Sequence, residues 1–294
     1  MERLGSMLAS TPDAELLQPF AHGATDRGLV RSGNEDQFLI AVLRKSMQIQ
    51  QCSFSAPTTR VAHEAGHLWL VADGMGGHEG GETASLLATE AIEEFALNVL
   101  KWFFHLRGAE GSELLLEFEQ ALRSADQRLV HEAAHDPTLF GMGTTVTVAF
   151  FLASTAFVLH VGDSRCYLLK RGVLSQVTRD HTLRELLAGR GELPPDEATQ
   201  ARMSHILTNV VGGPSAGIHV DIHKVKVEPG DQLLLCTDGL TAMLTDAEIT
   251  DVLLAAVSSE TACRALIEAA NRGGGHDNAT AIVARFESVE KAAL

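Results

Sequence analysis

Four aspartates stand beside apolar, strand-like runs of the sequence. Asp73 follows LWLVA, Asp163 follows FVLHVG and Asp238 follows QLLLCT, whereas Asp277 comes shortly before TAIVARF. A single aspartate after a strand is ordinarily a turn residue. Four such acids along one chain instead predict a shared site at the ends of neighbouring strands.

Carboxylates at adjacent strand ends would lie close together, because neighbouring strands are only about 4.8 Å apart. Like charges at such separations are costly unless a cation neutralises them. An all-oxygen donor set is typical of Mg²⁺ or Mn²⁺. Two such ions can activate a water molecule against phosphorus. Gly74, which follows Asp73, adds a backbone carbonyl that no side chain screens.

A separate polar cluster reads Arg31-Ser32-Gly33-Asn34-Glu35-Asp36. A guanidinium can hold two phosphate oxygens at once, whereas lysine acts only as a point charge. Taken alone, Arg31 is equally well interpreted as a solvated loop residue.

The elements that must position these residues follow from the hydrophobic pattern. Strands are expected at 68–73, 144–152, 156–161, 218–227, 231–237 and 279–286, and helices at about 82–107, 112–134, 246–256 and 259–271. Helices grouped apart from runs of strands favour an α+β fold, with antiparallel sheets covered by helices. We expect one domain over 20–290 after a tail at 1–19. It would carry a hairpin loop or insertion at about 44–66 and a mobile flap at about 180–205.

Composition excludes several classes of protein. The 294 residues are 45% hydrophobic and carry a net charge of −15, which argues against partners with anionic surfaces such as nucleic acids or membranes. The four cysteines form no C-x-x-C pair, and no C-x₅-R loop of a thiol phosphatase occurs. The N-terminal residues lack the apolar core of a signal peptide. We therefore expect a reduced, cytoplasmic protein. We also expect a monomer.

Two patterns could mislead. The uncharged stretch 144–162 is long enough to span a bilayer, but its β-branched and aromatic residues favour two buried strands joined by a tight turn. Residues 63–67 read His-Glu-Ala-Gly-His, a zinc motif that works only on a helix. A strand-like run follows this motif at once, so we expect no zinc site there.

Six motifs occur in a fixed order: RSGNED, VADGMGG, GMGTT, VGDSR, CTDGL and HDNAT. This series resembles that of the metal-dependent (type 2C, PPM) Ser/Thr protein phosphatases of bacterial type, over about 24–286. The resemblance implies two antiparallel β-sheets sandwiched between helices, with a metal site between the sheets. It also implies hydrolysis of phosphoserine and phosphothreonine in proteins by direct attack of a metal-bridging water or hydroxide.

The resemblance also implies a role for individual residues. Asp73 resembles the carboxylate that bridges two Mn²⁺ or Mg²⁺ ions, and Asp238 and Asp277 resemble the remaining ligands of the first ion. The Gly74 carbonyl resembles a ligand of the second ion. Asp36, with Glu35 beside it, is similar to that ion's water-mediated partner.

Three further roles complete this set. Asp163 resembles the acid that holds a third, weaker metal, and Arg31 resembles the phosphate-binding arginine. Met75 stands where eukaryotic relatives carry a histidine, so His78 is the local candidate for a general acid; its alternative is a surface residue at a helix start. The expected partners are phosphorylated proteins made by a Ser/Thr kinase. The alternative is a catalytically weak or inactive, phosphoprotein-binding regulatory member of the same fold, which should have lost ligands that this chain retains.

Overall fold

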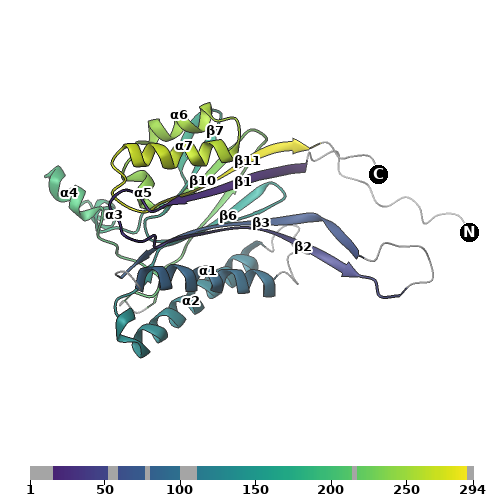
Figure 1. The fold of residues 1–294 in the computed structure, drawn as a ribbon, viewed down its shortest axis with the longest axis horizontal. Helices are drawn as coiled ribbons and strands as arrows, with labels where there is room; N and C mark the ends of the chain where they lie inside the picture. Colours follow the sequence, from purple (N-terminus) through teal and green to yellow (C-terminus); the bar gives the residue numbers. More distant parts are fainter. Residues whose placement is uncertain (1–15, 52–58, 77–79, 100–110, 214–216, 290–294) are drawn as a thin grey trace, which may run out of the picture.

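A computed structural model describes residues 16–51, 59–76, 80–99, 111–213 and 217–289. Within these residues two antiparallel sheets lie face to face (Figure 1). One sheet runs in the order β1 (Leu16–Asp26), β11 (Ala279–Val289), β10 (Gln232–Cys236), β7 (Arg165–Lys170) and β8 (Val173–Gln176). The other runs in the order β2 (Asp36–Gln48), β3 (Thr59–Met75), β5 (Val146–Leu152), β6 (Thr155–Val161) and β9 (Asp221–Lys226), with β4 (Gly143–Thr144) paired to β3.

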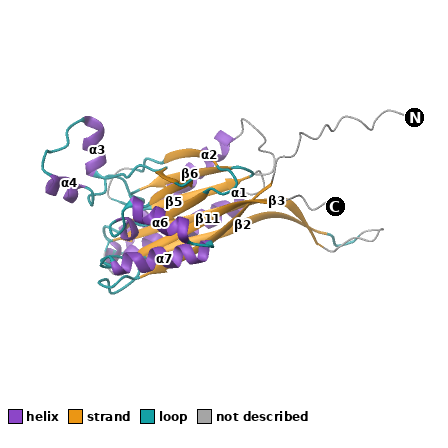
Figure 2. Ribbon diagram, turned by 90° about the horizontal axis from the view of Figure 1, so that it is seen from above, coloured by secondary structure: helices purple, strands orange, loops and turns teal. Residues whose placement is uncertain are grey.

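Helices cover the outer face of each sheet. The sheet that contains β3 packs against α1 (Gly80–Val99) and α2 (Gly111–His135), which leads into the short 3-10 helix η2 (Pro137–Leu139). The sheet that contains β11 packs against α5 (Asp238–Thr241), α6 (Asp246–Ala255) and α7 (Ser259–Arg272). The helices α3 (Leu183–Arg190) and α4 (Glu197–Met203) project from one end, as Figure 2 shows. The expected four-layer α+β sandwich is confirmed.

The central strands are buried on both faces, which is why they read as unbroken apolar runs. Along β3, Leu68 and Leu70 belong to the core under α1 and α2, whereas Trp69 and Val71 belong to the core between the sheets. Trp69 meets Phe286 of β11 edge-on, with ring centroids 6.0 Å apart. The side-chain alternation of a strand therefore fills two cores at once.

The two misleading patterns both form strands. Residues 146–161 make the hairpin of β5 and β6, which turns at Ala153 with a φ of 57°. Residues 63–67 lie within β3, so the His-Glu-Ala-Gly-His motif is not helical. In the described part of the chain, no helix is long and apolar enough to cross a bilayer.

The region expected as a loop or insertion at 44–66 is more regular than the sequence indicated. Its two ends extend β2 and β3 into a long hairpin, paired as far as Gln48 and Thr59. The polar side chains of this stretch obscured the strand pattern because the hairpin extends beyond the body of the sandwich (Figure 2). Residues 52–58 lie outside the described residues.

Candidate metal centre

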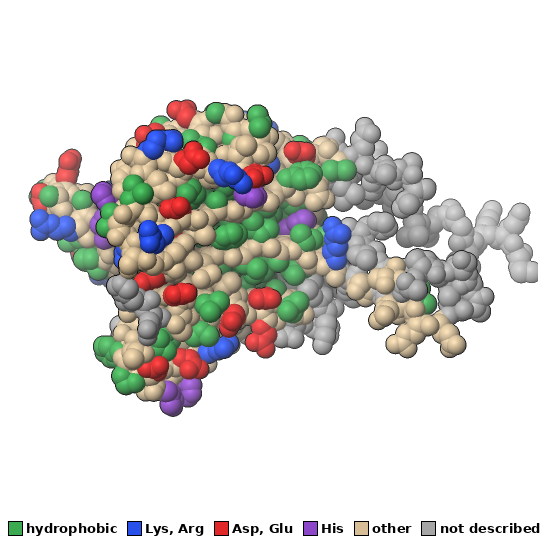
Figure 3. Space-filling view, viewed as in Figure 1, with side chains coloured by type: hydrophobic (Ala, Val, Ile, Leu, Met, Phe, Trp, Pro, Cys, Tyr) green, Lys and Arg blue, Asp and Glu red, His purple; other side chains and the backbone are tan. Residues whose placement is uncertain are grey.

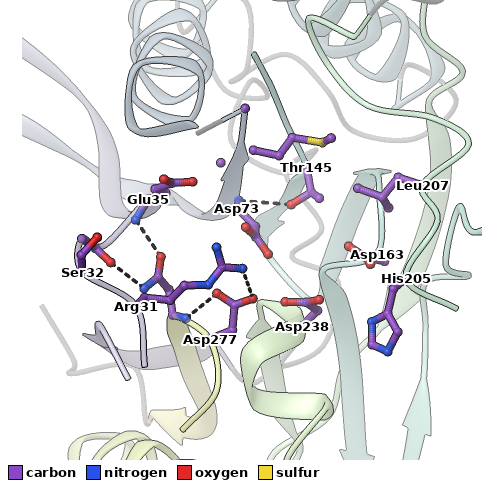
Figure 4. Close-up of a pocket in the computed structure, with 15 residues that line it drawn as sticks. Arg31, Ser32, Glu35, Asp73, Thr145, Asp163, His205, Leu207, Asp238 and Asp277 are labelled. Atoms are coloured by element: carbon purple, nitrogen blue, oxygen red, sulfur yellow. Dashed lines mark hydrogen bonds and ion pairs between the residues drawn. The ribbon is translucent and has the colours of Figure 1, made fainter. Parts of the chain in front are cut away.

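The acids at the strand ends meet because the chain direction alternates. Strands β3, β6 and β10 end at the same edge of the sandwich, whereas β2 and β11 begin there. A pocket of about 610 Å³ opens at this edge (Figure 4). The predicted site residues that line it are Arg31, Glu35, Asp73, Gly74, Asp163, Asp238 and Asp277.

Asp73 and Asp238, which come from opposite sheets, form the floor of the pocket. Asp73 follows the buried part of β3, and Asp238 begins α5 directly after β10. Their carboxyl groups share a hydrogen bond. Burial raises the pKa of Asp73 well above its usual value, and the charges of Asp36 and Asp238 raise it further. The floor therefore concentrates more negative charge than it can neutralise by itself.

Asp36 lies opposite Asp73 in the β2–β3 register but is buried behind the pocket wall, with 4% of its surface exposed. Its Oδ2 accepts hydrogen bonds from Thr237 (2.8 Å) and Thr280 (2.6 Å). Its Oδ1 is buried with no hydrogen-bond partner. Burial outweighs the two hydrogen bonds and raises the pKa of Asp36 to about 7, and the charge of Asp238 adds to this effect.

Asp163 approaches the floor from the end of β6. It lines the pocket while only 8% exposed. Burial, followed by the charges of Asp238 and Asp180, raises its pKa to about 7. Thus the acids that the sequence placed in different motifs repel one another in a single pocket.

Glu35 and Gly74 form a close backbone contact on another side of the pocket. The Gly74 N–H donates to the Glu35 carbonyl oxygen at 3.2 Å. A side chain at Gly74 would collide with the backbone of Gly81. Gly74 and Gly81 therefore let three backbone segments meet beside the acids.

Arg31 and Asp277 form the rim of the pocket. The Arg31 guanidinium donates to Asp277 Oδ2 at 2.6 Å, and the two side chains are 52% and 34% exposed. The predicted phosphate-binding cation is thus held over the acids, with part of its surface open to solvent.

Thr145 and Asn278 fix the backbone around the site, a role that motif order alone did not predict. Thr145 Oγ1 accepts the Asp73 N–H at 3.1 Å, and the Thr145 N–H donates to the Asp73 carbonyl oxygen at 2.9 Å. The Asn278 amide donates to the carbonyls of Arg27 and Gly33, both at 2.9 Å, and its Oδ1 accepts the Glu35 N–H at 2.8 Å. Thr145 lies in the motif GMGTT and Asn278 lies in the motif HDNAT. Their membership of these motifs is the sequence feature from which a role at the site could have been predicted.

The candidate flap is attached on both sides of Asp163. The His181 N–H donates to the Gly162 carbonyl oxygen at 2.7 Å, and Arg165 holds the Asp180 carboxylate through two nitrogens at 2.9 and 2.7 Å. The flap contains α3 and α4, so its polar stretch is partly helical. Just at and beyond its expected end, His205 and Leu207 line the pocket; neither residue was predicted from the sequence.

Comparison with known proteins decides the family. The family model described as Protein phosphatase 2C matches residues 55–266, most of the chain. The chain belongs to the protein phosphatase 2C family. Its two antiparallel sheets and flanking helices agree with that assignment, as does the order of its six motifs.

Other members of the 2C family resemble this chain over most of its length. The serine/threonine protein phosphatase PstP of Mycobacterium tuberculosis is 33% identical over 88% of this chain, although the match spans only 43% of PstP. The serine/threonine phosphatase stp of Listeria welshimeri is 32% identical over 91% of this chain and 96% of its own length. The chain thus spans less than half of one relative and nearly all of the other.

Solved 2C structures share the fold. The catalytic domain of PstP in complex with 2 manganese ions matches with a TM-score of 0.70 and 31% identity, over 92% of this chain and all of that one. The serine/threonine phosphatase of S. agalactiae matches with a TM-score of 0.73 and 26% identity, over 91% of this chain and 99% of that one.

The donor set of this 2C chain fits a hard divalent cation. The charged groups at the pocket floor are oxygens, and burial, followed by mutual repulsion, raises the pKa of Asp73 and Asp238. A divalent ion in the pocket would offset the repulsion between these carboxylates. Among the described residues no three His, Cys, Asp or Glu side chains already enclose one point; Arg31 instead neutralises part of the charge by pairing with Asp277. His78 lies outside the described residues.

Proposed function

We propose that this chain is a metal-dependent protein serine/threonine phosphatase that hydrolyses phosphoserine and phosphothreonine. One observation carries the proposal: acids from separate motifs converge in a pocket that concentrates negative charge, and an exposed guanidinium stands at its rim. A pocket that needs divalent cations and offers a phosphate-binding arginine suits phosphoryl transfer to water.

The proposed metal ligands follow the sequence prediction. Asp73 would bridge two Mn²⁺ or Mg²⁺ ions, and Asp238 and Asp277 would complete the first site. The Gly74 carbonyl would serve the second site. Asp163 would hold a third, weaker ion. Support for these roles comes from the shared pocket and from the raised pKa of three of the acids, Asp73, Asp163 and Asp238.

We assign different roles to the neighbouring acids Glu35 and Asp36. Glu35 lines the pocket, so it is the better placed of the two to reach the second ion through water. Asp36 is buried behind Asp73 and held by Thr237 and Thr280, so we assign it to shaping the charge of the floor. The contacts of these two acids thus distinguish Glu35, which faces the pocket, from Asp36, which supports the floor from behind.

When bound, the metal ions would supply the charge that makes a water molecule nucleophilic at neutral pH and would offset the charge of the phosphate. The chain's own residues supply the rest. Arg31 would turn from Asp277 to the phosphate oxygens, where it stabilises the charge of the transition state. Thr145 and Asn278 hold the backbone of the acids and of the Arg31 loop in place. His78 would protonate the departing serine or threonine oxygen.

The same proposal includes the setting of the reaction. The substrates would be proteins phosphorylated by a Ser/Thr kinase, and the enzyme would act as a cytoplasmic monomer. Three cysteines in the described residues, Cys166, Cys236 and Cys263, are free and buried, which suits a reducing compartment.

A phosphothreonine peptide assay on the purified chain tests the proposal. We expect phosphate release with Mn²⁺ or Mg²⁺ and none in excess chelator, with recovery when the metal is returned. Full activity in chelator would refute the metal mechanism. Tight binding of the phosphopeptide without release under any metal would instead support the inactive regulatory alternative.

A further inference from the structure

The five-residue pattern His-Glu-x-x-His occurs a second time in the chain, at 131–135, and there it is helical. His131 and His135 lie in the last turns of α2 (Gly111–His135). Residues four apart on a helix lie on one face, one turn apart. The strand motif at 63–67 lacks this arrangement, so only the second copy meets the geometric condition for a shared metal ion.

The two imidazole rings are already side by side. Their centroids are 4.2 Å apart, with an angle of 48° between the ring planes. Both side chains are exposed. Figure 3 shows histidine side chains gathered at the lower edge of the molecule, over α2. Little rearrangement is needed for both rings to reach one ion.

A hydrogen bond fixes the state of one ring. His135 Nδ1 lies 2.7 Å from the His131 carbonyl oxygen, and because a carbonyl can only accept, Nδ1 carries the proton. In the neutral ring this arrangement leaves the lone pair on Nε2 of His135. Histidines that bind metals in proteins commonly donate their other ring N–H to a backbone carbonyl in this way.

The surroundings favour a cation. The C-terminal end of a helix carries partial negative charge, which stabilises cations within the last turn. Glu132 and Asp136 are exposed beside the two histidines and add two carboxylates. The chain as a whole carries a net charge of −15.

We propose that His131 and His135 form a surface binding site for a borderline transition-metal ion, Zn²⁺ being the probe of choice. The ion would take two imidazole ligands and complete its shell with water, since imidazole suits Zn²⁺, Cu²⁺ and Ni²⁺ rather than Mg²⁺. Neither histidine lines the pocket, so the site is separate from the metal centre. Within the described residues no third His, Cys, Asp or Glu side chain joins the pair, so we assign binding to it and not peptide hydrolysis.

Calorimetric titration of the untagged chain with Zn²⁺ tests the site. Excess Mg²⁺ is present throughout to occupy the oxygen ligands of the pocket. We expect His131→Ala and His135→Ala each to remove one equivalent of bound Zn²⁺ or to weaken that equivalent by at least about tenfold. His131→Cys, which supplies another zinc donor, should restore binding. Gln120→Ala, which changes an exposed, uncharged residue about three turns earlier on α2, is the control and should keep the equivalent.

Histidine proton resonances of the unmodified chain provide a second measurement that needs no variant. Substoichiometric Zn²⁺ should perturb two imidazole signals, and His131→Ala and His135→Ala should each remove one of those two signals. Equal numbers and affinities of bound Zn²⁺ in the unmodified chain and in both alanine variants, with α2 intact by circular dichroism, would overturn the proposal.

Discussion

The floor and the rim of the pocket differ in how their charges are balanced. On the floor, Asp73 and Asp238 are withdrawn from water among other acids, and burial raises the pKa of both. At the rim, Arg31 and Asp277 are exposed and of opposite sign, and they pair at 2.6 Å. Among the described residues no cation forms an ion pair with the two floor acids, whereas the rim acid Asp277 is paired with Arg31.

The difference separates two kinds of binding. A divalent ion gains most from the floor, because repulsion between the carboxylates is relieved there. A phosphate gains most from the rim, where the guanidinium can exchange one carboxylate partner for phosphate oxygens in solvent. Substitutions in the two regions should therefore affect metal binding and substrate binding to very different extents.

The largest effect is expected for Asp73→Asn. The substitution removes a charge from the centre of the floor, so Mn²⁺ affinity and kcat should fall together, the latter by several orders of magnitude. Calorimetry and turnover of a phosphothreonine peptide measure both. Asp251→Asn, an exposed carboxylate on α6, is the matched control and should change neither. An active Asp73→Asn enzyme with intact metal affinity would contradict the role of the floor.

The next largest loss of activity is expected for His78→Ala. His78 is the proposed general acid, a role that involves neither the floor nor the rim. A general acid contributes about 10²–10⁴-fold when the leaving group is a poor one. The variant should therefore lose that much on a phosphothreonine peptide and far less on p-nitrophenyl phosphate, whose phenolate leaves unaided. Asp73→Asn should impair both substrates alike. Equal losses on both substrates for His78→Ala would remove the acid role.

Arg31→Ala should lower kcat/KM without weakening metal binding, because Arg31 belongs to the rim and not to the floor. Loss of charge-assisted hydrogen bonds to phosphate, worth about 1.5–3 kcal/mol, corresponds to roughly a 10–100-fold drop in kcat/KM. Metal affinity should stay the same or rise slightly, because Asp277 loses its competing partner. Arg31→Lys keeps the charge but not the fork, so it should recover only part of the loss. Loss of bound metal in Arg31→Ala would show that the two regions are not separable.

The fold was predictable because each central strand forms an unbroken apolar run in the sequence. LWLVA and TAIVARF are apolar on both faces, and both strands fill two cores. The ends of the long hairpin at 44–66 were not recognised, because their polar side chains lack the pattern of a buried strand. Residues 193–200 of the candidate flap were expected as a polar stretch, yet α4 begins there, with the Asp196 side chain accepting the Thr199 N–H as the N-cap. Local capping is visible in the sequence only once a helix is suspected.

The site was predictable to the level of motifs and not of contacts. Asp73, Asp163, Asp238 and Asp277 share one pocket, as their positions beside strands indicated. The burial of Asp36 behind that pocket depends on Thr237 and Thr280 from the other sheet. Such partners are distant in sequence, so only the strand register brings them into view.

The metal-free floor should make folding stability fall as pH rises. The pKa of Asp36 and of Asp163 is about 7 in the folded chain, against about 4 in an unfolded chain. A raised folded-state pKa means that the native state binds protons more tightly. The stabilisation is therefore complete below about pH 4 and is lost progressively as pH rises through about 7.

Denaturant unfolding of the chelated protein between pH 5 and pH 8 measures this effect. We expect the free energy of unfolding to be lower at pH 8 by about 5 kcal/mol, about half from each acid, and saturating Mn²⁺ to remove most of the difference. Asp36→Asn should flatten the metal-free profile, whereas Asp251→Asn should leave it unchanged. A metal-free stability that rises with pH over this range would contradict the repulsion on the floor.

The smallest effect on turnover is expected for the cysteines, because the three that the structure describes lie in the cores and not in the pocket. Cys166 belongs to the core between the sheets, and Cys236 belongs to the core under α6 and α7. Burial raises the pKa of the Cys236 thiol to about 12 and also raises that of Cys166, so neither supplies the thiolate that a covalent mechanism needs. Replacing all four cysteines by alanine should leave kcat of the folded protein within about twofold, while the midpoint of unfolding falls through lost packing. Rapid quenching during turnover should trap no cysteinyl phosphate. A trapped cysteinyl phosphate, or a loss of kcat as large as that of Asp73→Asn, would show that a thiol and not the metal site on the floor provides the nucleophile.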